Sequence, residues 1–307
     1  LELGIKGSIV VNDRMETSVP DIYAAGDAVQ VKHYVTGDDA LISLAGPANK
    51  QGRIIADNIC GGDSRYLGSQ GSSVIKVFDM TAATTGINET NAKKSGLEVD
   101  TVILSPMSHA GYYPGGKVMT MKVVFEKETY RLLGAQIIGY EGVDKRIDVL
   151  ATAIHAGLKA TQLKDLDLAY TPPYSSAKDP VNMAGFMIDN IAKGTLKQWH
   201  LEDMDKISRD KSVVLLDVRT VGEFNRGHMD GFKNIPVDEL RERINEIEKG
   251  KPVYLICQSG LRSYIASRIL EGNGYETYNF SGGFRFYDAV VNDRALIEKA
   301  YACGMDY

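Results

Sequence analysis

Residues 253–263 are Val253-Tyr254-Leu255-Ile256-Cys257-Gln258-Ser259-Gly260-Leu261-Arg262-Ser263. The apolar run predicts a buried strand that ends on Cys257, and the residues that follow the loop predict an amphipathic helix. A thiol in this position faces backbone N–H groups, the amino end of the helix and Arg262, and all three stabilise a thiolate. The pattern therefore predicts a reactive cysteine. Its loop, Gln258-Ser259-Gly260-Leu261, is expected to bind an anionic group carried on the sulfur.

The segments around this loop alternate between strand and helix patterns. Strands are predicted at 213–217, 253–257 and 276–280, and helices at 221–225, 238–249 and 262–271. Strands separated by helices indicate a parallel sheet with its site at the strand ends. A polar, glycine-containing stretch at 193–200 predicts a boundary, so we expect this α/β domain to cover residues 200–307.

Two further domains are expected upstream, which makes the predicted fold a multidomain α/β and α+β chain. Residues 70–192 alternate strands and helices in the manner of an α+β layer. The strands are predicted at 74–78, 99–104, 118–125 and 132–138, and the helices at 88–94, 143–155 and 180–191. Residues 1–65 show a strand at 9–11, a short strand entering the corner Gly26-Asp27, and a helix at 47–60. Because these strands are too few to close a sheet, we expect more chain upstream of Leu1.

Composition narrows the function classes. The chain has 307 residues, 44% hydrophobic and 24% charged, and a net charge of −5, so it has no electrostatic reason to bind nucleic acid or an anionic membrane. It contains no run of about 20 apolar residues and no signal-peptide pattern, which favours the cytoplasm. Its three cysteines, Cys60, Cys257 and Cys303, lie far apart without a CxxC pair. Neither a disulfide framework nor a metal site is therefore expected.

The C-terminal region resembles the rhodanese family over about 105 residues. The loop from Cys257 to Arg262 fits that family, and three further segments follow its signature: Leu216-Asp217-Val218-Arg219-Thr220-Val221-Gly222-Glu223-Phe224, residues 226–236, and Gly282-Gly283-Phe284. The resemblance implies that Cys257 accepts a sulfane sulfur as a persulfide and passes it to a thiol. The alternative is a buried core thiol. Asp217, Arg219, Glu223 and His228 are expected to be structural, and Cys60 and Cys303 inert.

The segment Thr17 to Ala28 resembles the second flavin motif of the pyridine nucleotide-disulfide oxidoreductases. The resemblance implies that Asp27 accepts a hydrogen bond from a ribityl hydroxyl of FAD. It also implies that the helix beginning near Leu44-Ala45 points its amino end at the flavin. The alternative is an acidic turn that caps a helix. No G-x-G-x-x-G motif opens a βαβ unit, so the NAD(P)H site and the redox-active cysteine are expected upstream.

Two loops, 109–116 and 170–180, concentrate tyrosine, proline and glycine. By residue type alone they are tight turns with packing tyrosines. Together with residues 47–53, they resemble the coenzyme A-disulfide reductase branch of the flavoprotein family. The resemblance implies a homodimer in which one tyrosine of each loop reaches the substrate sulfur. The residues to which it assigns these roles are Tyr112 and Tyr170 as catalytic groups, Tyr113 and Tyr174 as substrate contacts, and Asn49 and Lys178 as contacts to coenzyme A.

Together these resemblances predict a reductase that uses FAD and NAD(P)H and acts on coenzyme A disulfide, coenzyme A persulfide or polysulfide. Its partners are small-molecule thiols, disulfides and persulfides, and its rhodanese domain relays sulfane sulfur through Cys257. Three alternatives stay open. They are a stand-alone sulfurtransferase with a dimerisation module, a non-catalytic persulfide-binding module, and an NADH oxidase or peroxidase of the same family. The rhodanese domain and the paired tyrosines weigh against the last.

Overall fold

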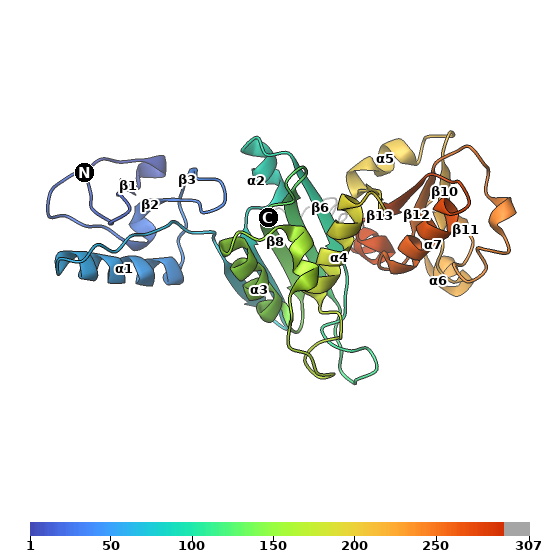
Figure 1. Cartoon of the computed structure of the whole chain (residues 1–307), viewed down its shortest axis with the longest axis horizontal. Helices are drawn as coiled ribbons and strands as arrows, with labels where there is room; N and C mark the ends of the chain where they lie inside the picture. The colour runs from blue at the N-terminus through green and yellow to red at the C-terminus, as the bar shows by residue number, and fades with distance from the viewer. Residues whose placement is uncertain (292–307) are drawn as a thin grey trace, which may run out of the picture. The chain divides into compact units, whose positions relative to one another are not determined.

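The structure is a computed structural model, and it describes residues 1–291 (Figure 1). The chain divides into two compact units. The first comprises Leu1–Asp100, Val124–Ile138 and Gly142–Leu158, and the second comprises Thr101–Val123, Gly139–Glu141 and the described residues from Lys159 on. Three sheets are present among the described residues, one of three strands and two of five. Within residues 1–291, no helix has the length and apolar character that crossing a membrane requires.

The N-terminal sheet is small and is covered by one helix. Its strands are β1 (Ile9–Val10), β2 (Val29–Lys32) and β3 (Asp39–Ala40); β1 and β2 are parallel, and β2 and β3 antiparallel. Helix α1 (Ala45–Ile59) lies along this sheet (Figure 1). Its Ile54 and Ile55 pack against the buried Val29 and Val31 of β2. The short 3-10 helices are η1 (Ile5–Gly7) and η2 (Gly26–Ala28). The predicted strand before the Gly26-Asp27 corner is wrong: only Tyr23 forms an isolated bridge there, and the strand follows the corner.

The second sheet has the order β4-β5-β8-β7-β6. Its strands are β4 (Ser73–Val77), β5 (Met80–Gly86), β6 (Val99–Leu104), β7 (Met119–Glu126) and β8 (Leu132–Gly139). The associated helices are α2 (Glu89–Lys94), α3 (Val143–His155), η3 (Ala160–Asp165) and α4 (Pro180–Ala192). All predicted strands and helices of this region are confirmed. Strand β5 was not predicted, because its sequence is rich in Ala and Thr and carries no alternating pattern.

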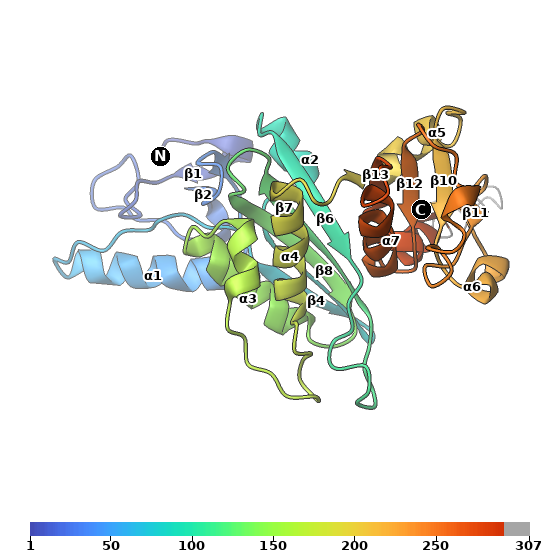
Figure 2. The same cartoon turned by 45° about the vertical axis from the view of Figure 1, so that its right-hand side comes forward.

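The third sheet is parallel throughout and has the order β11-β10-β12-β13-β9. Its strands are β9 (Gln198–Trp199), β10 (Val214–Asp217), β11 (Lys233–Asn234), β12 (Val253–Ile256) and β13 (Thr277–Phe280). Its helices are η4 (Leu201–Asp203), α5 (Met204–Ile207), α6 (Val221–Arg226), η5 (Ile244–Glu246) and α7 (Leu261–Glu271). Helix α7 packs against β12 and β13 (Figure 2). The predicted α/β class with a parallel sheet is confirmed, and Cys257 follows β12 directly.

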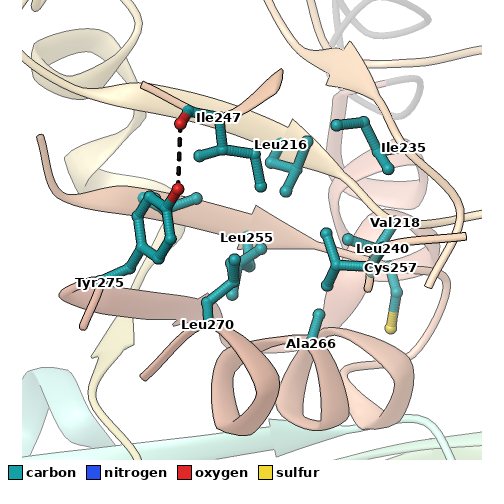
Figure 3. Close-up of a cluster of buried hydrophobic side chains, with 11 residues drawn as sticks. Leu216, Val218, Ile235, Leu240, Ile247, Leu255, Cys257, Ala266, Leu270 and Tyr275 are labelled. Atoms are coloured by element: carbon teal, nitrogen blue, oxygen red, sulfur yellow. Dashed lines mark hydrogen bonds between the residues drawn. The ribbon is translucent and has the colours of Figure 1, made fainter. Parts of the chain in front are cut away.

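The core beneath α7 explains one wrong prediction. Figure 3 shows this apolar cluster, with Cys257 at one end and Tyr275 at the other. The predicted helix at 238–249 is absent, and only the short η5 forms there. The hydroxyl of Tyr275 donates to the carbonyls of Ile244 at 3.3 Å and Ile247 at 3.1 Å. A side chain distant in sequence therefore hydrogen-bonds to backbone carbonyls in a segment that the hydrophobic periodicity assigns to a helix. Leu240 and Ile247 of this segment are nevertheless buried.

Candidate active site

Cys257 lies where β12 ends, and two donors point at its sulfur. The residue is 1% exposed. The Gly260 N–H donates to Sγ at 3.1 Å, and the Ser263 hydroxyl donates to it at 3.2 Å. The thiol is thus as buried as a core cysteine. An inert core cysteine has no need of such donors, whereas they stabilise a thiolate.

Both backbone polar groups of Gly260, its N–H and its carbonyl, are fixed by hydrogen bonds. Its φ of +97° is a backbone conformation that favours glycine, and it turns the N–H toward the sulfur. Its carbonyl accepts a hydrogen bond from the buried Asn279 of β13 at 3.1 Å and another from Ser263 at 3.1 Å. The loop therefore has one defined conformation with its amide directed at Cys257.

The turn Gly282-Gly283-Phe284 supports the loop from behind. The Phe284 N–H donates to the Cys257 carbonyl at 2.8 Å. A Cβ added at Gly283 would lie 2.7 Å from backbone atoms of Ser259, and the φ of Gly283 is +68°. Only glycine allows this close approach, which explains the glycine pair in the sequence signature.

Arg262 is paired with Glu223 of α6. Its guanidinium donates two hydrogen bonds, both of 2.7 Å, to the two carboxylate oxygens. This contact, with help from the Thr220 hydroxyl and N–H, lowers the pKa of Glu223 to about 2. The Glu223 contact likewise raises the pKa of Arg262, with a smaller contribution from the charge of Cys257. Glu223 thus positions Arg262 beside the loop.

We predict that the Glu223 pair gives this region an acid-dependent stability. Because the folded-state pKa lies below the ordinary 4.5, the pair stabilises the fold above that pH. The contribution disappears as the pH falls from about 4.5 toward about 2. Wild type should lose about 1–2 kcal/mol more than Glu223→Gln over this window. Urea unfolding followed by fluorescence of Trp199, the one tryptophan of the chain, measures this loss. Equal acid dependence in both proteins would contradict it.

Asp217 and Arg219 form a buried ion pair beneath the loop. Their side chains are 0% and 2% exposed, and the shortest nitrogen–oxygen distance is 2.7 Å. The Arg219 guanidinium also lies 3.8 Å from the centre of the Phe284 ring and donates to the Gly227 carbonyl at 2.8 Å. A weaker contact of 3.4 Å joins it to the Gln258 side chain. These contacts agree with the structural role expected for the pair.

A cavity of about 390 Å³ borders the cysteine loop. Its walls are mainly apolar side chains of α4 and of the end of β6. Its lining also includes four residues predicted from the sequence: Lys178, Ser259, Gly260 and Leu261. Gln258 does not line it. The carbonyl oxygen of the Asn279 side chain, also in the lining, is buried and has no hydrogen-bond partner among the described residues. The cavity therefore offers an apolar slot with one unused acceptor and one lysine.

The two tyrosine loops meet. The hydroxyls of Tyr112 and Tyr170 lie 2.7 Å apart, and this hydrogen bond raises the pKa of Tyr170. Both side chains are exposed, at 76% and 44%. The Ala110 N–H donates to the Ser175 carbonyl at 2.8 Å and ties the loops together. Tyr113 and Tyr174 are exposed beside them at 43% and 71%, so the four predicted tyrosines share one surface region.

The Gly-Asp corner lies at the start of α1. Asp27 is exposed, and its carboxylate has no hydrogen-bond partner among the described residues. The adjacent Gly26 is fixed by its φ of +74° and by a 2.7 Å bond from its N–H to Gln51 of α1. No side chain caps the first turn of α1, so the alternative of a capping acidic turn does not hold.

Two predicted residues of α1 are partly engaged. The Leu44 N–H donates to the Ile42 carbonyl at 3.0 Å, whereas the Ala45 N–H has no partner among residues 1–291. The Asn49 side-chain NH₂ donates to the Ala45 carbonyl at 3.0 Å, and this hydrogen bond does not use the side-chain oxygen of Asn49. A carboxylate without a partner beside an uncapped helix start fits the ribityl hydroxyls and the anionic ring of a flavin.

Outside the cysteine loop, residues 1–291 contain one further cysteine, Cys60. Cys60 is free and exposed, and Cys303 lies outside the described residues. Among residues 1–291, no cluster of three or more His, Cys, Asp or Glu side chains could hold a metal ion.

Sequence alone did not identify Ser263 or Asn279 as parts of the site. Ser263 lies in the first turn of the predicted helix, and this place puts it near the sulfur. Asn279 comes from a different strand, β13, and no local pattern marks it.

Two family models match the chain. Residues 72–180 match the dimerisation domain of the pyridine nucleotide-disulphide oxidoreductases. Residues 200–289 match the rhodanese-like domain. Both matches fall where the sequence resemblances lie.

Two longer proteins of known structure are also similar to the chain. CoADR-RHD of Bacillus anthracis has 47% sequence identity and a TM-score of 0.92, with 96% of this chain and 53% of that chain covered. An NAD-dependent persulfide reductase from A. fulgidus has 41% identity and a TM-score of 0.86, with 94% and 52% covered.

A coenzyme A disulfide reductase of Staphylococcus aureus (strain bovine RF122 / ET3-1) is 38% identical over 188 residues, which are 61% of this chain and 42% of that protein. The chain thus spans about half, or less, of the length of these relatives. The matches confirm the two resemblances. The chain thus combines a segment that matches the dimerisation domain of the pyridine nucleotide-disulphide oxidoreductases with one that matches the rhodanese-like domain, and it is similar over most of its length to CoADR-RHD.

Proposed function

We propose that this chain transfers sulfane sulfur through Cys257 as part of an FAD- and NAD(P)H-dependent reductase of coenzyme A disulfide, coenzyme A persulfide or polysulfide. One observation carries the proposal: the sulfur at the end of β12 receives hydrogen bonds from the Gly260 amide and the Ser263 hydroxyl. The relatives named above as a persulfide reductase and a coenzyme A disulfide reductase support the substrate class. A reduced thiol is required, so we place the protein in the cytoplasm.

The transfer step needs no redox partner. The Cys257 thiolate attacks the outer sulfur of a persulfide, R–S–S⁻. A bond forms between Sγ and that sulfur, the S–S bond of the donor breaks, and the donor leaves as the thiolate R–S⁻. The outer sulfur of the new cysteine persulfide carries the negative charge, which the loop amides and the start of α7 stabilise. The reverse attack, by an acceptor thiolate, returns Cys257 to its starting state.

Mass spectrometry of the purified chain tests this step directly. The reduced protein is mixed anaerobically with coenzyme A persulfide, and its peptides are analysed without reductant. We expect the peptide that contains Cys257 to gain the mass of one sulfur atom and to lose it again when excess coenzyme A is added. A label that appears on Cys60 and not on Cys257 would refute the proposal.

The cavity beside the loop supports coenzyme A as the carrier. The carrier arm of coenzyme A is a flexible chain that contains apolar groups, amide N–H donors and anionic phosphates. The apolar walls, the unused Asn279 acceptor and the Lys178 ammonium match these three features. We therefore assign Lys178, Ser259, Gly260 and Leu261 to the binding of this arm. Gln258 and Asn49 are assigned to the sulfur loop and to coenzyme A respectively.

The flavin side of the reaction uses the corner at Asp27. The Asp27 carboxylate would accept a ribityl hydroxyl of FAD, and the Ala45 N–H in the first turn of α1 would face the flavin ring. Bound there, FAD would pass reducing equivalents from NAD(P)H to a disulfide or persulfide. The Gly26–Gln51 bond holds the corner against the helix, so the carboxylate and the helix start keep a fixed relation.

The paired tyrosines complete the reductase site in a homodimer. Their hydroxyls share a hydrogen bond, so one of them can donate to a thiolate while the other supports it. The match to a dimerisation domain over residues 72–180, which includes both loops, supports a partner subunit as the recipient. Tyr113 and Tyr174 lie on the same surface and are assigned to substrate contact.

We predict that Tyr112→Phe combined with Tyr170→Phe slows coenzyme A disulfide reduction at least about tenfold in the flavin-loaded enzyme. The phenol that donates to the leaving thiolate and the phenol that supports it are then both lost, while the aromatic rings remain. The measurement is NAD(P)H consumption with coenzyme A disulfide. Tyr140→Phe is the control, because Tyr140 is 50% exposed and lies outside both loops. An unchanged rate in the double variant would overturn the assignment.

A further inference from the structure

The Ser263 hydroxyl has one proton to donate in a hydrogen bond, and two acceptors lie within reach of it. The residue lies in the first turn of α7 and is 0% exposed. Its Oγ lies 3.1 Å from the Gly260 carbonyl oxygen and 3.2 Å from the Cys257 sulfur. A serine hydroxyl donates a single hydrogen bond, so at any moment it serves one of the two acceptors.

The charge on the sulfur decides which acceptor is favoured. A neutral thiol is a weak acceptor, so the hydroxyl donates to the Gly260 carbonyl. A thiolate is a much stronger acceptor, because hydrogen bonds to an ionised group are roughly twice as strong as neutral ones. Rotation about the Ser263 side chain therefore brings the donor to the sulfur when the sulfur becomes anionic.

Asn279 lowers the free-energy cost of this change of hydrogen-bond partner. Its side-chain amide donates to the same Gly260 carbonyl at 3.1 Å, and the residue is 3% exposed. When the Ser263 proton leaves for the sulfur, the buried carbonyl keeps a donor, and no unsatisfied polar group is created. The Gly260 N–H, which belongs to the preceding peptide group, stays on the sulfur at 3.1 Å.

The charged groups around the sulfur are already engaged elsewhere. Arg262 donates two hydrogen bonds to Glu223, and Arg219 is paired with Asp217. Among the described residues, no arginine hydrogen bond reaches Sγ. Arg262 acts on the sulfur through its charge at a distance, which leaves short-range stabilisation to the neutral donors Ser263 and Gly260.

We propose that Ser263 is a catalytic residue of the sulfur-transfer site, whose hydroxyl switches from the Gly260 carbonyl to Cys257 Sγ and stabilises the thiolate selectively. Asn279 is the positioning residue that permits the switch. This inference rests on the proposed function for its biological meaning, but it concerns the ionisation of one thiol and can be tested without any turnover.

The test compares two serines of the same helix. Ser267 is 2% exposed and donates to the carbonyl three residues earlier, as Ser263 does, but it does not contact the cysteine. Ser267→Ala therefore removes an equivalent helical hydrogen bond without touching the sulfur. The readout is the ultraviolet absorbance of the Cys257 thiolate in the full chain. It is obtained as the difference between each variant and the same variant with Cys257→Ser added.

We expect Ser263→Ala to lower the thiolate-to-thiol ratio of Cys257 about tenfold near pH 7, because a hydrogen bond to an ionised group is worth about 1.5 kcal/mol. Ser267→Ala should leave the ratio unchanged. The thiolate absorbance of the two proteins should become equal only at a pH high enough to ionise the thiol fully in both. An unchanged ratio in Ser263→Ala, or an equal fall in both alanine variants, would overturn the proposal.

A second pair covers the case in which Ser263→Ala does not fold. Ser263→Thr and Ser263→Val have the same shape, and only Thr keeps the hydroxyl. The Thr variant should retain at least about ten times the thiolate-to-thiol ratio of the Val variant near pH 7. Equal ratios would overturn the proposal. The Ser263 variants could change the thiolate-to-thiol ratio as expected while Cys257 never accepts sulfur from a persulfide. That result would support this inference and refute the proposed function.

Discussion

Replacing Cys257 with serine is expected to slow sulfane-sulfur transfer by about 10³-fold or more, because a serine hydroxyl is not ionised near neutral pH and cannot carry a persulfide. The change should leave the fold intact. The side chain fills one end of the apolar cluster in Figure 3, and the Gly260 and Ser263 donors can serve an oxygen acceptor as well as a sulfur. The loss is therefore attributable to the reacting atom.

The measurement is anaerobic transfer of sulfur from polysulfide to excess thiol, followed by the release of sulfide. Cys60→Ser is the matched control, since it makes the same atomic change at an exposed cysteine at the end of α1. Trp199 fluorescence verifies the fold of the domain that holds Cys257, because the Trp199 indole donates to the Leu255 carbonyl of β12 at 3.3 Å. Equal sulfide release by wild type and Cys257→Ser would show that the rhodanese-like domain is not the route of the sulfur.

The strand-loop-helix around Cys257 could be predicted from sequence because its determinants are local. An apolar run, a glycine that adopts positive φ and an amphipathic helix are consecutive in the chain, and the structure reproduces them with strand and helix ends shifted by one residue. The same holds for the support turn, since the closeness of Gly283 to Ser259 demands a residue without a Cβ. Local chemistry thus defined the candidate nucleophile and most of its loop.

Contacts between distant segments could not be predicted in this way. The partner of Arg262 is Glu223, 39 residues earlier, and the donor that frees Ser263 is Asn279 on another strand. The helix predicted at 238–249 failed for the same reason, because Tyr275 takes the carbonyls of Ile244 and Ile247. Periodicity reports which side chains are buried, and Leu240 and Ile247 are, but it does not report which backbone groups a remote side chain occupies.

Asp217→Asn is expected to destabilise the rhodanese-like domain by about 3–5 kcal/mol. The variant keeps the size of the side chain but leaves the Arg219 guanidinium, which is 2% exposed, without its counter-charge. Removing one partner of a buried ion pair lowers the free energy of unfolding by far more than the intact pair adds to it. The reason is that the other charge stays in a medium of low polarity. The midpoint of urea unfolding, monitored by Trp199 fluorescence, measures the loss.

The control is Glu239→Gln, which breaks an ion pair of the same domain that is exposed. The Glu239 and Arg243 side chains are 49% and 34% exposed, so their separation should cost no more than about 1 kcal/mol. Arg219 also reaches the Gln258 side chain and lies over the Phe284 ring, so loss of its counter-charge should disturb the cysteine loop before the domain unfolds. Asp217→Asn should therefore slow sulfur transfer at urea concentrations where it is still folded. Equal unfolding midpoints for the two variants would contradict the prediction, because the buried Asp217 pair would then stabilise the fold no more than the exposed Glu239 pair.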